Sequence, residues 1–349
     1  MIKKEYIFVS TGYAGGASRF INDHITYLAK KNKKTVLVDD EPSKTFSKIP
    51  NRTLIKKVKV NKFNLNSREK LKKLFFDNKA EKIVFLTNYA FLIKYFSLIK
   101  EFKKNKIKII LTVHSGLFNL TLKKYIAGLI FSLIYKKVDF LYFGSKSAKK
   151  WWLKFYPWMK IEKNLVRYNG VEFQKNLKFR TIKKKVCVSF VGRLERENNP
   201  EFFLKIANDY SKKNSSVIFN IFGNGVMLNH LKNITKNQNI RFYGWREKKE
   251  IYKNSDIIII TSNINNFPYV ALEAKSFGIP IISCSKGDIR RIIKNNFDGY
   301  ISYTNSTETF IRLIDKILDK YCFFSKNSIQ RSRSFEIGNA LNKFWKNIL

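Results

Sequence analysis

Several residues that could bind an anion follow directly after short apolar segments of the sequence. Gly192 and Arg193 come after residues 186–191, and the planar guanidinium of an arginine can donate to two phosphate oxygens at once. Gly15 and Gly16 precede a helical pattern, so bare backbone N–H groups at the start of that helix could hold a phosphate. Their spacing fits neither G-x-G-x-x-G nor a P-loop. A surface arginine and an ordinary strand-to-helix turn are the alternatives for these two pairs.

Glu273 is the acid that could bind hydroxyl groups, and it lies in the stretch TSNINNFPYVALEAKSFGIPII (261–282). An apolar strand pattern precedes this stretch, and a helical pattern inside it ends at a glycine that is followed by a proline. A carboxylate near the start of a helix can accept hydrogen bonds from sugar hydroxyls. The amides of Val270, Ala271 and Leu272 would then point toward a phosphate above them. The alternative is an ordinary acid that complements the helix dipole.

Three other candidates also end apolar segments. His114 closes a strongly apolar segment, so we expect it to face a ligand-binding cleft, whereas His24 and His230 lie in amphipathic helical patterns and are expected on the surface or in packing. Gly223, in the sequence IFGNG, is typical of a strand-to-helix turn. Trp245, in the sequence FYGW, could stack on a base or form a wall beside it.

Short apolar segments alternate with longer helical patterns along the chain, which favours parallel β-sheets covered by helices on both faces. The expected strands are 6–9, 35–38, 82–86, 107–113, 140–143, 165–168, 186–191, 216–222, 240–243, 257–260, 279–283 and 299–301. The expected helices are 18–30, 67–77, 90–102, 121–136, 145–154, 200–212, 226–237, 248–254, 269–277, 289–294, 306–321 and 335–348. Ligands of open α/β sheets bind outside the carboxyl ends of the strands, where the candidate residues above would lie.

The polar and basic segment 174–185 lacks periodicity and separates two such patterns. We therefore predict a first α/β domain at 1–178 and a second at 179–330. A C-terminal helix in 331–349 is expected to pack back on the first domain. Three dispersed cysteines favour a reducing, cytoplasmic setting. No segment has the ~18 apolar, uncharged residues of a membrane span, so we expect a soluble or peripheral protein.

The chain is strongly basic, with 68 Lys and Arg against 26 Asp and Glu and a net charge of +42. Either lysine is simply its usual surface residue, or the charge attracts a polyanion. In the segment SKSAKKWWLKFYPWMK (145–160), lysines and aromatic residues alternate. This composition predicts contact with an anionic membrane surface through Lys149–Lys160. The alternatives are an aromatic helix face in the core and single-stranded nucleic acid, which is not expected as a partner.

In order and spacing, the motifs resemble those of glycosyltransferase family 4. FVGRLERENNPEFFLKIA resembles the segment G-R-L-x-x-x-K-N-P, and FNIFGNG resembles the G-x-G turn. IRFYGWREKKEIYKNSDIIIITS and NNFPYVALEAKSFGIPIIS resemble the F-x-G…Y-x-x-A/S-D and E-x7-E blocks, and KGDIRRIIKNNFDGYI resembles the G-G-x-x-E segment. GGASRF, TVHSG, GSKSAKKW and RYNGVEF fall where the family has its first-half motifs.

This resemblance implies a GT-B fold, in which two Rossmann-like domains face each other across a cleft. It implies that the domain at 1–178 lies on the acceptor side and that the domain at 179–330 binds the nucleotide-sugar. It implies a retaining transfer of a sugar from a nucleotide-sugar, with UDP- and GDP-sugars preferred, to a glycan, a lipid-linked acceptor or a surface polymer. The expected location is the cytoplasm or the cytoplasmic face of the membrane. No cofactor and no metal are expected: the sequence has no D-x-D motif, and an arginine with helix amides can supply fixed positive potential instead.

The resemblance also implies roles for individual residues. His114 would contact the donor sugar near the reacting carbon, Arg193 would neutralise the leaving diphosphate, and Glu273 would bind the ribose hydroxyls. Gly16 would bring backbone N–H groups to the diphosphate. The remaining donor-binding candidates are Gly15, Gly192, Asn198, Gly223, Trp245, Asn265, Asn266, Phe267, Val270, Ala271 and Leu272.

Three positions depart from the family pattern. Asn198 replaces the lysine that follows G-R-L, Asn265 replaces the first acid of E-x7-E, and Arg291 replaces the acid of G-G-x-x-E. An amide at residue 265 can still bond a sugar hydroxyl, which is compatible with an altered sugar preference. The alternative is a catalytically impaired relative that binds a glycan or a polyanion.

Overall fold

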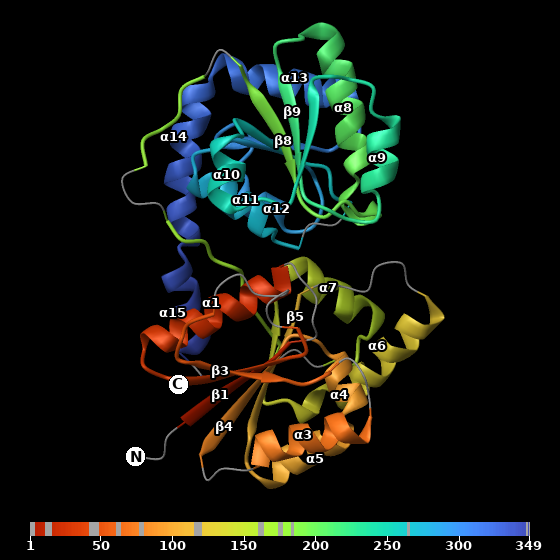
Figure 1. The fold of residues 1–349 in the computed structure, drawn as a ribbon, viewed down its shortest axis with the longest axis vertical. Coiled ribbons are helices and arrows are strands. Elements are labelled where there is room, and N and C mark those ends of the chain that lie inside the picture. Colours follow the sequence, from red (N-terminus) through yellow and green to blue (C-terminus); the bar gives the residue numbers. More distant parts are fainter. Residues whose placement is uncertain are drawn as a thin grey trace. The chain divides into compact units, whose positions relative to one another are not determined.

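The structure is a computed structural model, and it describes residues 4–10, 16–41, 49–60, 64–76, 80–114, 121–159, 164–173, 177–182, 185–263, 266–346 and 348. The chain forms two compact units (Figure 1). Unit 1 comprises Met1–Tyr168 with Ile348, and unit 2 comprises Asn169–Asn347 with Leu349.

Unit 1 contains a seven-stranded parallel sheet in its described residues, with the strand order β3-β2-β1-β4-β5-β6-β7. The strands are β1 (Lys4–Val9), β2 (Lys34–Asp39), β3 (Thr53–Lys57), β4 (Glu81–Leu86), β5 (Lys108–Val113), β6 (Phe140–Phe143) and β7 (Asn164–Val166). The helices are α1 (Gly16–Lys30), α3 (Leu65–Phe76), α4 (Ala90–Lys94), α5 (Phe96–Lys104), α6 (Leu122–Ile134), η1 (Tyr135–Lys137) and α7 (Lys146–Phe155).

Two features of unit 1 differ from the sequence prediction. The edge strand β3 was not expected, because only its first residue is buried and the segment therefore has no apolar alternation. The helix expected at 90–102 is broken at Tyr95, whose backbone leaves the helical region. The Tyr95 side chain is buried, and its hydroxyl donates to the Val60 carbonyl at 3.3 Å. This tertiary contact accompanies the break between α4 and α5.

Unit 2 contains a six-stranded parallel sheet with the order β10-β9-β8-β11-β12-β13 in its described residues. The strands are β8 (Cys187–Val191), β9 (Ile218–Phe222), β10 (Ile240–Gly244), β11 (Ile257–Ile260), β12 (Ile281–Cys284) and β13 (Gly299–Ser302). The helices are η2 (Arg196–Asn198), α8 (Pro200–Lys213), α9 (Leu228–Ile234), α10 (Lys248–Lys253), α11 (Tyr269–Ser276), α12 (Ile289–Ile292), α13 (Thr307–Asp319), α14 (Tyr321–Ser332), η3 (Arg333–Phe335) and α15 (Ile337–Trp345). The alternating pattern of the sequence therefore predicted both parallel sheets correctly.

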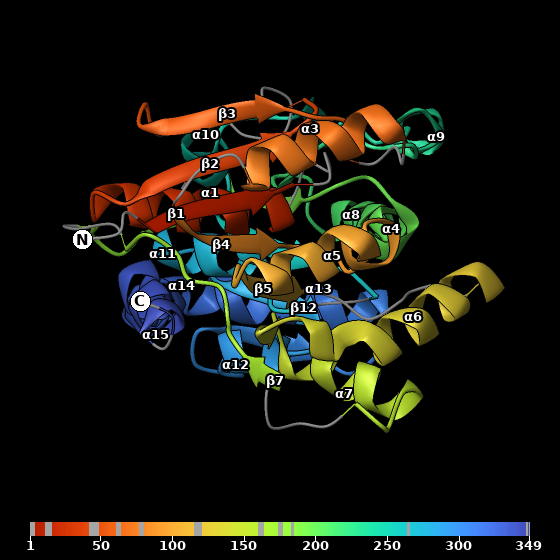
Figure 2. The same cartoon turned by 90° about the horizontal axis from the view of Figure 1, so that it is seen from below.

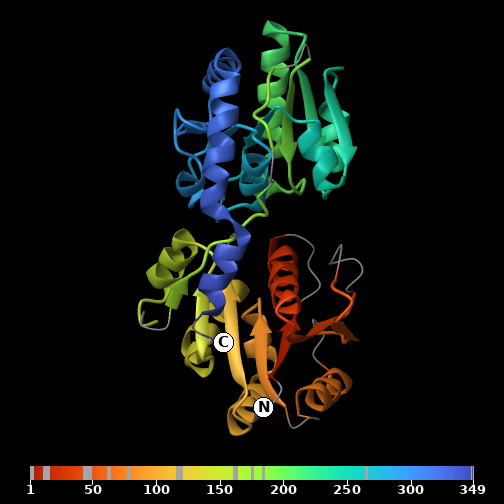
Figure 3. The ribbon, with the colours of Figure 1, turned by 90° about the vertical axis from the view of Figure 1, so that its left-hand side faces the viewer.

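Helix α14, drawn in blue in Figures 1 and 3, was not expected from the sequence. It was missed because its buried face is largely polar. That face includes Ser325 and Ser328 together with Phe324 and Ile329, so the segment shows little apolar periodicity. Ile329 packs against Gly278, the second residue after α11. At this glycine φ is +69°, a conformation that disfavours a side chain and that ends α11.

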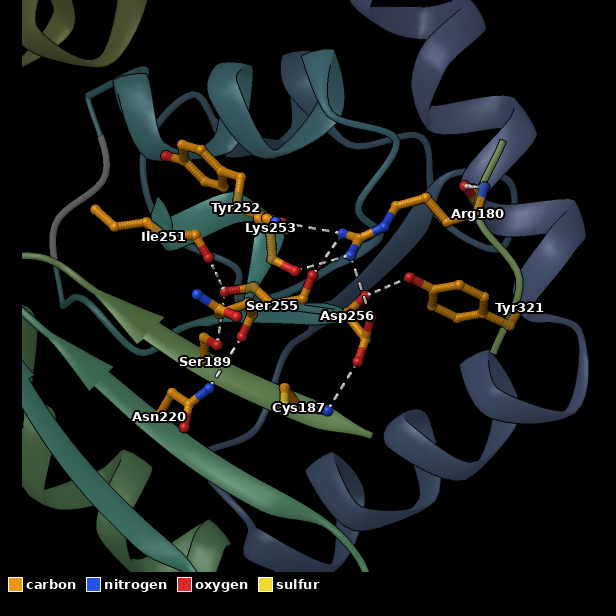
Figure 4. Close-up of polar contacts among 12 residues, drawn as sticks. Arg180, Cys187, Ser189, Asn220, Ile251, Tyr252, Lys253, Ser255, Asp256 and Tyr321 are labelled. Atoms are coloured by element: carbon orange, nitrogen blue, oxygen red, sulfur yellow. Dashed lines mark hydrogen bonds and ion pairs between the residues drawn. The ribbon is translucent and has the colours of Figure 1, made fainter. Parts of the chain in front are cut away.

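The segment around Arg180, which lies in the polar segment 174–185 and at the start of the predicted second domain, belongs to unit 2. The Arg180 guanidinium donates to the backbone carbonyl of Tyr252 at 3.1 Å and lies 3.3 Å from a carboxylate oxygen of Asp256 (Figure 4). The Arg180 N–H donates to the Ser325 hydroxyl at 2.8 Å. These bonds attach the segment around Arg180 to the amino ends of β8 and β11 within unit 2.

Candidate active site

Three glycine loops lie together at the carboxyl ends of β8, β9 and β10. The Gly192 N–H donates to the Phe222 carbonyl at 3.0 Å, and the Gly223 N–H donates to the Gly244 carbonyl at 2.8 Å. Gly223 has a φ of +134°, and a Cβ at this position would overlap the Gly192 carbonyl. Only glycine permits this approach of the two loops. The sequence prediction that Gly192 and Gly223 each follow the end of a strand is confirmed, whereas their role in donor binding stays a prediction.

Arg193 follows Gly192, and its guanidinium lies at the surface. One guanidinium nitrogen donates to Glu197 at 2.9 Å, with 60% of the arginine side chain and 46% of the glutamate side chain exposed. Exposed pairs of this kind contribute little to stability because water screens them. A doubly charged phosphate would compete well for the same donors. Arg193 is therefore held at the surface by a weak ion pair.

Asn198 forms hydrogen bonds within the loop that follows β8 and to the residues that follow β11. Its side-chain amide donates to the Arg193 carbonyl at 2.8 Å, and its side-chain oxygen accepts a bond from the Ser262 hydroxyl at 3.3 Å. The Asn198 carbonyl accepts a bond from the Thr261 hydroxyl at 2.8 Å. These contacts join the Arg193 loop to the end of β11. In this structure the asparagine that stands at the family's lysine position supports Arg193.

Glu273 lies on the second turn of α11 and is 8% exposed. The Tyr252 hydroxyl donates to one carboxylate oxygen at 2.7 Å, and the Lys248 ammonium lies 3.1 Å from the other. Lys248 and Tyr252 are one helical turn apart on α10, so both side chains reach the same acid. Sequence reasoning missed these two residues, although their spacing in the segment KKEIY was a usable signal.

The start of α11 is held by its own backbone and by Phe267. The Ala271 N–H donates to the Pro268 carbonyl at 3.2 Å, so this amide is already engaged within the first turn. Phe267 is 2% exposed, has a φ of +75°, and accepts a bond from the Asn169 side chain at its carbonyl at 3.2 Å. The Phe267 side chain therefore belongs to the core, where it meets the ring of Phe335.

The other candidates near α11 differ in burial or lie outside the described residues. Val270 is half-buried and Leu272 is buried, as is Ala271. Asn266 is half-buried, and Asn265 lies outside the described residues. Trp245 follows β10 and is 66% exposed, which leaves the face of its indole available for stacking on a planar ligand.

In unit 1, His114 directly follows β5. Its Nε2 lies 3.2 Å from the Thr112 hydroxyl, and the ring of Phe20 meets the imidazole edge-on at a centroid distance of 4.6 Å. Burial lowers the pKa of His114 from 6.5 to about 4. The imidazole is therefore neutral at pH 7 and can donate or accept a hydrogen bond. Gly16 begins α1, and Gly15 lies outside the described residues.

The aromatic residues of 145–160 divide between the core and the surface. Trp152, Tyr156 and Met159 are fully buried, whereas Trp158 is 46% exposed; Lys160 lies outside the described residues. For the buried residues, the core interpretation of the pattern is correct. In the part of the chain that the structure describes, no group of three or more His, Cys, Asp and Glu side chains could hold a metal ion. Nor does any described helix have the length and apolar character to cross a membrane.

Comparisons with known proteins agree with this arrangement. Residues 172–334 match the family model "Glycosyl transferases group 1". The UDP-Gal:alpha-D-GlcNAc-diphosphoundecaprenol alpha-1,3-galactosyltransferase of Escherichia coli is 31% identical over 140 residues, which span 38% of this chain and 36% of that protein. A Campylobacter jejuni relative, GalNAc-alpha-(1->4)-GalNAc-alpha-(1->3)-diNAcBac-PP-undecaprenol alpha-1,4-N-acetyl-D-galactosaminyltransferase, is 25% identical over 99% of this chain and 98% of its own length.

Among solved structures, Anabaena Alr3699/HepE in complex with UDP and glucose superposes with a TM-score of 0.79, at 12% identity and over 99% of both chains. At this identity the similarity shows the fold alone. The two parallel sheets and this neighbour show that the chain has the GT-B fold. The family match in unit 2 and the relatives along the chain together support a glycosyltransferase of the GT-B fold.

Proposed function

We propose that this chain transfers a sugar from a UDP-sugar to a lipid-linked glycan, with retention at the anomeric carbon and without a bound metal ion. The observation that carries the proposal is the carboxyl edge of the second sheet. There the surface guanidinium of Arg193 and the exposed indole of Trp245 lie on loops joined by backbone bonds through Gly223. These loops belong to the segment that matches the glycosyl transferase model.

The donor fits this edge by its chemistry. A nucleotide-sugar carries a base that can stack on Trp245, a ribose whose hydroxyls can donate to Glu273, and a diphosphate that can bind Arg193. UDP is preferred over GDP because the E. coli relative is named for UDP-Gal and the Anabaena structure holds UDP.

In the chemical step the hydroxyl oxygen of the acceptor bonds to the anomeric carbon while the bond between that carbon and the diphosphate oxygen breaks. Negative charge grows on the leaving UDP, which takes up the proton of the acceptor hydroxyl. The Arg193 guanidinium stabilises this charge, and its orientation is set by the loop that Asn198 supports. The neutral His114 contacts the sugar in the way that the family resemblance implies. Retention also rests on the family resemblance.

The acceptor is proposed from the relatives. The E. coli and C. jejuni proteins are both named for acceptors in which a sugar is linked to undecaprenol through a diphosphate. A glycan on such a lipid is an intermediate of cell-surface polysaccharide assembly, and the proposed location is the cytoplasmic face of the membrane.

The test is a transfer assay with the full chain. UDP-Glc, UDP-Gal, UDP-GlcNAc, UDP-GalNAc and GDP-Man are each supplied with a GlcNAc-diphosphoundecaprenol acceptor, with and without EDTA. The products are identified by mass spectrometry, and the anomeric configuration is read from proton coupling constants. We expect turnover of a UDP-sugar, unchanged by EDTA, with the donor's α configuration kept.

Glu273→Ala should raise the KM for the donor roughly tenfold to a hundredfold, because hydrogen bonds to a charged group are lost. Glu250→Ala is the matched control, since Glu250 is an exposed acid on α10 whose carboxylate pairs with Arg246 at 3.0 Å. Absence of binding and turnover with every donor would overturn the proposal. An inverted product would contradict retention alone.

A further inference from the structure

Helix α6 in unit 1 has an inner face that packs in the ordinary way. Gly128, Phe131 and Ser132 are buried. The Phe131 ring meets the rings of Tyr89 and Trp152 at centroid distances of 5.2 and 5.1 Å. This side therefore satisfies the packing of α6 against the rest of unit 1.

The opposite side of α6 is also apolar, but it is exposed. Leu122 is 75% exposed, Ile126 46%, Ile130 40% and Leu133 65%, and Tyr125 beside them is 38% exposed. Residues three or four apart lie on one face of a helix, so the four aliphatic side chains form one stripe. We call these five residues the α6 face. A helix at the surface of a globular protein normally presents polar side chains on its outer side. A continuous apolar surface of this kind marks a contact with another body.

Trp158 lies beside the α6 face. Its indole N–H donates to the Ser132 hydroxyl of α6 at 3.1 Å, while the side chain stays 46% exposed. The Tyr156 hydroxyl donates to the Tyr125 carbonyl at 3.1 Å and joins the same segment to the first turn of α6. Figure 2 shows α6 and α7 next to each other at the outside of unit 1. A tryptophan with an apolar body and a bonded N–H suits the boundary between water and lipid.

The segment 121–160, which contains the α6 face, is strongly basic. The segment 121–160 contains one acid, Asp139, whose carboxylate binds the Lys103 ammonium at 2.7 Å and the Ile109 N–H at 2.8 Å. The same segment contains nine lysines, namely Lys123, Lys124, Lys136, Lys137, Lys146, Lys149, Lys150, Lys154 and Lys160. The apolar stripe therefore lies within a strongly basic segment.

We propose that the α6 face and Trp158 dock on the surface of an anionic lipid bilayer. The aliphatic stripe would enter the boundary between headgroups and acyl chains, and the lysines of the segment would meet the lipid phosphates. A second copy of this chain would bring its own basic segment to the same contact, and the two would repel each other. With only 13 residues, α6 can lie in the interface but cannot span the membrane.

This surface differs from the one expected from the sequence, where the aromatic residues of Lys149–Lys160 were to make the contact. Trp152, Tyr156 and Met159 are buried, so α6 supplies most of the apolar surface and α7 contributes lysines. The inference does not rest on the transfer reaction, and its test measures no enzyme activity.

The test is co-sedimentation of the full chain with vesicles. Vesicles of equal parts phosphatidylglycerol and phosphatidylcholine are compared with vesicles of phosphatidylcholine alone. We expect binding to the anionic vesicles that weakens with salt. Ile126→Gln with Leu133→Gln should weaken it roughly tenfold or more, because binding scales with the apolar area that enters the interface. Leu65→Gln with Ile234→Gln is the matched control: these residues are 76% and 48% exposed and lie outside α6, and their replacement should change nothing.

A second measurement uses the native α6. The tryptophan emission should shift to the blue when anionic vesicles are added, and Trp158→Phe should remove most of that shift. Vesicle binding that the α6 substitutions leave unchanged would overturn the proposal, as would an emission that does not move. Masses from light scattering complete the test. A wild-type dimer that the α6 substitutions make monomeric, with vesicle binding unchanged, would assign the face to a second copy and also overturn it.

Discussion

The two ends of the second sheet use charge in opposite ways. At the amino ends of its strands, Asp256 is 1% exposed and the side chain of Arg180 is 17% exposed. One carboxylate oxygen of Asp256 faces Arg180 and the other accepts the Cys187 N–H at 2.9 Å (Figure 4). At the carboxyl ends, Arg193 and Trp245 remain mostly exposed. The first arrangement is buried and fixes the fold, whereas the second leaves a charged and an aromatic side chain at the surface.

We call the amino ends of these strands, with Asp256 and Arg180, the closed end, and the carboxyl ends, with Arg193 and Trp245, the open end. A second buried ion pair also serves the core. The Lys275 ammonium lies 2.8 Å from Asp298, and both side chains are 0% exposed. Asp298 also accepts the Lys294 N–H at 2.8 Å, just before β13 begins. Lys275 is two residues from Glu273 on the same helix. Helix α11 therefore carries one acid with a proposed ligand-binding role and one lysine that serves the core.

The largest expected effect is a loss of stability when the Asp256 interactions at the closed end are removed. Asp256→Ala leaves the Arg180 charge without its acid and the Cys187 N–H without its acceptor. We expect a loss of about 3–5 kcal/mol in the free energy of unfolding, as for other buried pairs that lose one partner. Urea titration of the variant measures this loss. Glu201→Ala, which removes an exposed pair with His230, should cost at most about 1 kcal/mol. Equal losses of unfolding free energy in the two variants would show that the Asp256 network stabilises the fold no more than an exposed ion pair does.

The next prediction concerns the removal of the Arg193 guanidinium at the open end. Arg193→Ala removes the cation proposed to stabilise the leaving diphosphate, and kcat should fall about a hundredfold to a thousandfold. The free energy of unfolding should change by less than about 1 kcal/mol, because the pair with Glu197 is exposed. Arg241→Ala, at an exposed position on β10, is the control. If Arg193→Ala lowered the stability and left kcat unchanged, Arg193 would support the fold and would not serve catalysis.

A pH titration sharpens the comparison at Lys275. Burial lowers its pKa from 10.5 to about 8 in the folded protein. Between these values the unfolded chain binds more protons than the folded one, so this lysine makes stability rise with pH. The stability of the wild type relative to Lys275→Met should therefore increase by about 3 kcal/mol from pH 8 to 10.5. Lys212→Met, at a side chain that is 79% exposed, should show no such trend. A flat difference for Lys275→Met would contradict the lowered pKa.

The strands and turns that carry the candidate site could be predicted from the sequence, because buried parallel strands are short apolar segments. The four isoleucines of β11 and the turn at Gly223 could be located from their residue types alone. The edge strand β3 could not, since it buries only one residue. The support that Asn198 gives Arg193 was also missed, because a side chain folded back on its own loop leaves no periodic signal.

The smallest expected effect concerns the hydrogen bond that positions Glu273. The Tyr252 ring stacks on Phe277 at a centroid distance of 5.0 Å, and Tyr252→Phe should keep this stacking while it removes the bond of 2.7 Å. We expect about 1 kcal/mol less stability. The donor KM should rise several-fold with little change in kcat, because the bond holds a group that binds the ribose and not the reacting atoms.

Urea titration and donor-dependent kinetics of Tyr252→Phe give both numbers, and Tyr243→Phe is the control on a ring that stacks on Phe222 at 4.9 Å. A donor KM that stays at the wild-type value would mean that Tyr252 serves only the fold. Lys248 and the backbone of α11 would then be sufficient to position Glu273, and the Tyr252 hydroxyl would contribute to stability alone.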